Sequence, residues 1–159
     1  MDGGSDGTWL QPSPDLLRMR LIELVAGTAV AAILAVVLGA LFASATIGAI
    51  AAGGVAVAGI AAAPFIVRRV RSWGYCERKD DLLVRRGLLI ARLTVVPYGR
   101  MQFIDVEAGP AERLFGLATV HLHTAAAASD ARIPGLDTAE AARLRDRLAT
   151  LGESRLAGL

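Results

Sequence analysis

The residues of this chain that could carry chemistry are a pair of histidines and a single cysteine. His121 and His123 alternate with apolar residues, so both imidazoles are expected on one face of a β-strand. Two imidazoles beside a carboxylate could hold a transition metal, but the sequence offers no recognisable third ligand. We therefore interpret the pair as part of a solvated strand face.

No catalytic constellation accompanies these residues. Cys76 is the only cysteine, which excludes an internal disulfide and a cysteine-rich zinc site. We find no nucleophile with a neighbouring base, no paired carboxylates and no phosphate-binding glycine loop. The sequence thus predicts a protein that is not an enzyme and has no metal or other cofactor.

A long uncharged run dominates the first half of the chain. The protein has 159 residues, 54% of them hydrophobic, and residues 25–67 carry no charge. As one helix this run would be about twice as long as the ~30 Å hydrocarbon core requires. Because backbone amides in hydrocarbon need internal partners, we expect a helical hairpin with spans at 21–43 and 47–67, broken at residues 44–46.

Arginines indicate how this hairpin is oriented. The connecting turn has no charge. The arginines that flank the two spans are Arg18, Arg20, Arg68, Arg69 and Arg71. By the positive-inside rule, both termini are expected in the cytoplasm of a cell-membrane protein with two spans. Small residues recur at a spacing of four along the first span, from Gly27 to Gly39, and suggest a ridge where the second helix packs closely.

The sequence thus suggests three regions: a flexible leader at 1–17, the membrane hairpin at 18–71 and a cytoplasmic domain at 72–159. In the last region the pattern changes from apolar runs to alternation. Strands are predicted at 73–78, 82–86, 88–95, 101–107 and 118–123, a tight turn at 113–116 and a loop at 125–128.

The chain closes with a predicted amphipathic helix at 138–151. Asp137 and Glu140 form a capping-box pattern, leucines such as Leu144 and Leu148 recur at helical spacing, and Gly152 is a stop signal. Short antiparallel strands followed by one such helix favour a small α+β domain. We expect a bent β-barrel or sandwich capped by the C-terminal amphipathic helix.

Four segments of this domain resemble a known family. They are residues 96–102 (VPYGRMQ), 105–106 (DV), 113–118 (RLFGLA) and 133–136 (IPGL). Together with the membrane hairpin before them, they are similar to the bacterial pleckstrin-homology-like (PH-like) membrane proteins of the YdbS-like kind, over nearly the whole chain after Leu17. The resemblance implies a bent antiparallel sheet capped by a C-terminal helix, and it implies no known enzymatic activity.

The leading hypothesis for function is a non-enzymatic interaction or self-assembly module held at the cytoplasmic face of the bacterial inner membrane. Its partner would be an unidentified membrane or cytoplasmic protein, or a second copy of the chain. The candidate contact residues lie in the family-like motifs: Tyr98, Arg100, Gln102, Arg113 and Phe115. The alternative is architectural, with Tyr98 and Phe115 in the core and Arg100 paired with Asp105.

A second hypothesis is a domain that senses anionic lipid. Arg68, Arg69 and Arg71 abut the membrane, where each gains ~1 kcal/mol from anionic headgroups, and Arg85 and Arg86 could extend this patch. The alternative is that the membrane-flanking arginines only set topology. Nucleic-acid binding is not expected because no basic cluster carries stacking aromatics, and no polar intramembrane site points to a transporter subunit.

Overall fold

The computed structural model describes residues 8–42, 44–88, 90–125 and 130–157, with side chains up to residue 154. The chain divides into two compact units. One comprises Leu17–Arg68, and the other joins Met1–Leu16 to Arg69–Leu159. Residues 1–7 of the predicted leader, position 43 of the first predicted span and most of the predicted loop at 125–128 lie outside the described residues.

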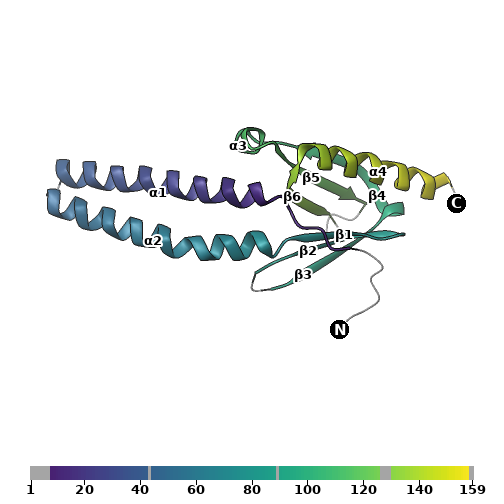
Figure 1. The fold of residues 1–159 in the computed structure, drawn as a ribbon, viewed down its shortest axis with the longest axis horizontal. Helices are drawn as coiled ribbons and strands as arrows, with labels where there is room; N and C mark the ends of the chain where they lie inside the picture. The colour runs from purple at the N-terminus through teal and green to yellow at the C-terminus, as the bar shows by residue number, and fades with distance from the viewer. Residues whose placement is uncertain (1–7, 43, 89, 126–129, 158–159) are drawn as a thin grey trace. The chain divides into compact units, whose positions relative to one another are not determined.

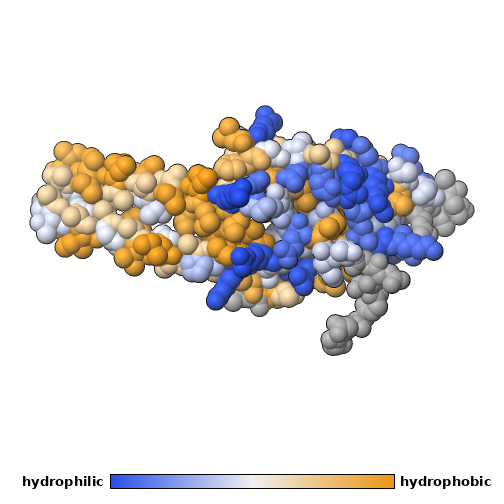
Figure 2. Space-filling model, in the orientation of Figure 1, coloured by the Kyte–Doolittle hydropathy of each residue, from blue (hydrophilic) through white to orange (hydrophobic). Residues whose placement is uncertain are grey.

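Two long helices form most of the first unit (Figure 1). They are α1 (Pro14–Phe42) and α2 (Ala45–Arg71), and both are long and apolar enough to cross a membrane. Apolar side chains cover them, as the orange surface in Figure 2 shows. The Ser44 hydroxyl accepts a hydrogen bond from the Ile47 amide and so caps α2 immediately after α1 ends.

The two helices are in close contact at some of their glycines. A side chain at Gly39 would collide with the backbone of Gly48, and one at Gly59 would collide with Thr28. Gly27, at the start of the predicted ridge, has no such neighbour. The ridge prediction is therefore right for Gly39 and wrong for Gly27, because the spacing of small residues does not specify which turn of a helix faces its partner.

The second unit contains two antiparallel sheets of three strands each (Figure 1). The first has the order β1 (Gly74–Glu77), β2 (Asp81–Arg86), β3 (Arg92–Pro97). The second has the order β4 (Met101–Glu107), β5 (Leu117–Thr124), β6 (Ala131–Asp137). A short 3-10 turn, η1 (Tyr98–Arg100), joins the sheets.

The C-terminal helix α4 (Thr138–Ala157) covers the second sheet and contacts η1. Its leucine stripe enters the core, where Leu144 and Leu148 are fully buried beside Val120 and Leu122 of β5. Burying a leucine side chain contributes about 1.5–3 kcal/mol, which makes this stripe a main source of the domain's stability. The expected membrane hairpin and helix-capped α+β domain are both confirmed.

Several local predictions differ from the structure. The third strand begins at Arg92 and not at 88, because Gly87 adopts a φ of +117° and opens a loop before the Arg86↔Arg92 pair. The predicted turn at 113–116 is preceded by a short helix, α3 (Pro110–Leu114), which Pro110 can start and which the Glu112 carboxylate caps at the Gly109 amide, 2.9 Å away.

The last two elements also differ. Strand β6 was not predicted, because Pro134 and a left-handed Gly135 (φ +68°) interrupt its alternation. Helix α4 continues past Gly152, which is not among the glycines with positive φ and therefore does not form the left-handed stop. Gly152 lies instead where a side chain would touch the Tyr98 carbonyl at 3.6 Å.

Part of the predicted leader is fixed to the domain. Leu10 and Tyr75 exchange two backbone hydrogen bonds of 2.8 and 2.9 Å, which add a bridge to the edge of β1. Ser13 donates its amide to the Gly135 carbonyl at 2.8 Å. The open edge of β1 has backbone groups that need partners, which explains the difference from a flexible leader.

Candidate functional site

A groove runs between strand β4 and helix α4. Its volume is about 270 Å³, and its walls are Met101, Gln102, Phe103 and Ile104 on one side, with Arg145, Leu148, Ala149, Gly152 and Glu153 on the other. The register of β4 is irregular between Met101 and Phe103, as at a β-bulge, and the four consecutive lining residues place the groove along the edge of this strand. Among the described strands β4 pairs only with β5, which leaves that edge open.

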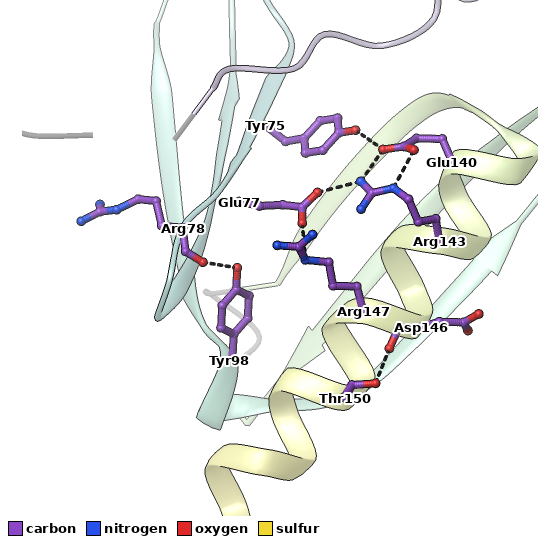
Figure 3. A network of polar contacts seen from close by, with 9 residues as sticks. All are labelled: Tyr75, Glu77, Arg78, Tyr98, Glu140, Arg143, Asp146, Arg147 and Thr150. Atoms are coloured by element: carbon purple, nitrogen blue, oxygen red, sulfur yellow. Dashed lines mark hydrogen bonds and ion pairs between the residues drawn. The ribbon is translucent and has the colours of Figure 1, made fainter. Parts of the chain in front are cut away.

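The α4 wall of this groove is held by polar contacts to β1 (Figure 3). Arg143 donates to Glu77 at 2.8 Å and to Glu140 at 2.6 Å, and Arg147 forms an ion pair with Glu77 at 3.0 Å. The Tyr75 hydroxyl donates to Glu140 at 3.0 Å. The hydrogen bond from Arg143 lowers the pKa of Glu140, so this carboxylate stays ionised and fixes α4 near neutral pH.

Of the predicted contact residues, Tyr98 is buried. Its side chain is 0% exposed, its hydroxyl donates to the Arg78 carbonyl at 2.8 Å, and burial raises its pKa to about 12. It cannot touch a partner without local unfolding. We therefore remove Tyr98 from the candidate surface, in agreement with the architectural alternative, because its ring fills the space between η1 and the core.

The other predicted contact residues do not form one surface. Gln102 lines the groove near the start of β4, and Arg100 is exposed on η1. Arg113 and the half-buried Phe115 lie beyond the other end of β4, where Arg113 donates to the Ala108 carbonyl at 3.0 Å. The ion pairs found among the described residues do not include Arg100 with Asp105.

Sequence reasoning missed Phe103 and the α4 side of the groove. Phe103 is a large apolar residue of the predicted strand at 101–107, and it is 52% exposed. Ala149 and Gly152 line the groove from the C-terminal helix. The small residues of this helix form no recognisable sequence pattern, and Gly152 was interpreted only as the signal that ends the helix. The available signal in the sequence was Phe103 itself, an apolar residue at a position where the alternation along its strand calls for a polar one.

The two histidines share one face of the second sheet with carboxylates. His121 Nε2 lies 3.5 Å from Glu107, and His123 lies 3.5 Å from Asp130 and 3.9 Å from Asp105. The ring of Phe103 stacks on His123 with centroids 4.2 Å apart. Within the described part of the chain, no group of three or more such side chains is arranged to hold a metal ion.

Cys76 lies inside the domain and is 0% exposed. Burial raises the pKa of its thiol, which therefore remains protonated near neutral pH. A protonated, inaccessible thiol is a structural residue.

The arginines of the second hypothesis lie in two places. Arg68, Arg69 and Arg71 occupy the exposed last turn of α2. Arg85 and Arg86 end strand β2, where the Arg85 guanidinium lies 5.1 Å from the centre of the Trp9 ring. The described side chains supply no carboxylate partner for Arg86.

Comparisons with known proteins agree with this architecture. A family model described as "Bacterial PH domain" matches residues 20–151. The transmembrane protein YdbS of Bacillus subtilis (strain 168) is 35% identical over 89 residues, which cover 55% of this chain and 55% of YdbS. The matched part is thus about half the length of that relative, and no solved structure matches. The chain belongs to the bacterial PH domain family, as a YdbS-like membrane protein.

Proposed function

We propose that this membrane protein is a non-enzymatic interaction module whose PH-like domain binds an extended polypeptide segment along the groove between β4 and α4. The observation that carries the proposal is the edge of β4, which pairs with no other described strand on that side and lines the groove opposite α4. The occupant is a strand of another polypeptide, either a partner protein or a second copy of this chain.

The chemistry of the groove suits such a segment. The unpaired backbone groups of an edge strand bind an extended peptide by main-chain hydrogen bonds, and neighbouring pockets select alternate side chains. Phe103 and Ala149 supply exposed apolar contact area, while Arg145 and Glu153 supply charge of both signs at the rim. We therefore expect a ligand with an apolar residue at every second position and polar residues between.

The membrane anchor supports the same role. A tethered domain is confined to a thin layer at the bilayer, where the effective concentration of a second tethered molecule is high enough for weak contacts to matter. We further propose that both chain termini are cytoplasmic, as the arginines near the start of α1 and the end of α2 favour. Reporter fusions at each terminus test this, and a C-terminal reporter active only outside the cytoplasm would contradict it.

Site-specific photo-crosslinking tests the groove. A photoreactive phenylalanine analogue replaces Gln102 in the full chain in its native membrane, and Leu114, which is 86% exposed on α3, is the control position. We expect a polypeptide adduct from position 102 and none from 114. The mass of the adduct distinguishes a second copy from another protein.

A groove-filling variant makes the result specific. Ala149 is exposed and lines the groove, so Ala149→Trp should fold normally while blocking an incoming strand. The yield of the position-102 adduct should then fall at least severalfold. Adducts with lipid alone, equal adducts from position 114, or a yield unchanged by Ala149→Trp would count against the proposal.

A further inference from the structure

The loop between β2 and β3 presents an apolar tip with a basic collar. Ile90 is 82% exposed and Leu93 is 55% exposed, although both are large apolar side chains. Arg86 and Arg92 pair across the two strands next to the loop and form its basic collar. One position farther from the loop, Leu93 of β3 lies opposite Arg85, whose guanidinium lies over the Trp9 ring. An exposed apolar tip beside cationic and aromatic side chains has the composition of a segment that enters a membrane interface.

The collar contains a repulsive pair. Arg86 and Arg92 lie directly opposite each other in the β2–β3 register. Like charges at such positions destabilise a hairpin by themselves. No carboxylate of the described residues forms an ion pair with either arginine, so both guanidinium groups are available to an anion from outside the domain.

The strand register shows where the tip lies in its sheet. Gly74, the first residue of β1, pairs with Arg85, so the β2–β3 tip and the start of β1 are at the same end of the sheet (Figure 1). Gly74 follows Arg71, the last residue of α2, by three residues, a reach of at most about 11 Å. The tip therefore belongs to the end of the domain that emerges directly from the membrane-spanning helix.

We propose that the β2–β3 tip docks on the bilayer that anchors the chain. Ile90 enters the boundary between headgroups and acyl chains, and Arg86 and Arg92 bind the phosphates of anionic lipids. The contact adds a second attachment point to the one formed by α2 and so fixes the face that the domain turns away from the bilayer. It is separate from the β4–α4 groove and stands or falls independently of the function proposed there.

Depth-dependent quenching tests this contact. The full chain with Cys76→Ala and Ile90→Cys is labelled with an environment-sensitive fluorophore and reconstituted in vesicles of equal parts phosphatidylcholine and phosphatidylglycerol containing spin-labelled lipid. A matched chain carries the label at Lys79→Cys, in the exposed turn between β1 and β2 at the opposite end of the same sheet. We expect the Ile90 label to be quenched and blue-shifted and the Lys79 label to remain in water.

Removing the collar tests the role of the arginines. In the Ile90-labelled chain, Arg86→Gln with Arg92→Gln should lower the ratio of embedded to exposed tip by about tenfold or more, while Arg132→Gln, on the exposed side of β6, should leave it unchanged. Because the vesicles contain only this chain, the label at position 90 would stay unquenched if the tip bound only a protein partner. That result, or equal quenching in phosphatidylcholine alone, overturns the proposal.

Discussion

Arg143 of helix α4 donates a hydrogen bond to Glu77 of strand β1 across 2.8 Å, and the same guanidinium holds Glu140 one turn away (Figure 3). Glu77 is only 12% exposed, so its charge depends on Arg143 and Arg147 for compensation. This relationship ties the last helix to the first strand of the domain. It thereby fixes one wall of the β4–α4 groove.

Replacing Arg143 should therefore destabilise the domain. Arg143→Gln leaves Glu77 with one cationic partner and is expected to cost about 1–2 kcal/mol, because the lost bonds are charge-assisted but partly exposed. Thermal unfolding of the full chain in detergent, followed by near-ultraviolet circular dichroism, measures this. Arg145→Gln is the control, since Arg145 pairs with the exposed Asp146 and should change stability very little. Equal effects of the two variants would show that the network does not hold α4.

Alkaline pH should weaken the domain through Tyr98. Its pKa is raised to about 12 by burial, above the ordinary value of about 10, so the neutral hydroxyl stabilises the folded state. This contribution is complete below pH ~10 and is lost as the pH rises through ~12. The unfolding midpoint of the full chain should fall over that range. The Tyr98→Phe variant should have a free energy of unfolding about 1 kcal/mol lower at neutral pH, and this free energy should decline less steeply as the pH rises.

The helical hairpin should respond to added volume at one glycine and not at another. A methyl group at Gly39 meets the backbone of Gly48, so Gly39→Ala is expected to cost about 1–3 kcal/mol by forcing α1 and α2 apart. Gly27→Ala lies on the same helix with no neighbouring atoms in reach and serves as the control. Protease resistance and thermal stability in detergent report the difference. A Gly27→Ala protein as impaired as Gly39→Ala would contradict the helix contact.

Two glycines with nearly the same backbone conformation allow a similar comparison in the soluble domain. Gly116 and Gly135 have φ of +65° and +68°, so alanine at either is strained. At Gly135 the new methyl group would also overlap the buried Leu16, whereas Gly116 has open space. Gly135→Ala should thus lower the free energy of unfolding by about 1–3 kcal/mol more than Gly116→Ala does. Equal losses would indicate that Leu16 moves aside without cost.

The sequence alone determined the features that depend on neighbouring residues. An uncharged run too long for one span predicts a hairpin, and apolar residues at spacings of two and of three or four predict strand β5 and helix α4. The order of four short motifs was sufficient to identify the family. These signals are readable because hydropathy and periodicity are properties of the chain before it folds.

Only the tertiary structure decided the rest. Tyr98 looks like a surface residue beside Arg100 until the core closes over it, and Gly152 looks like a stop until α4 continues past it. The edge of β4 becomes a groove only because α4 lies beside it, and Arg86 faces Arg92 only in the register that β2 and β3 adopt. Each of these facts depends on which segments meet in space, and contacts between distant residues leave no periodic trace in the sequence.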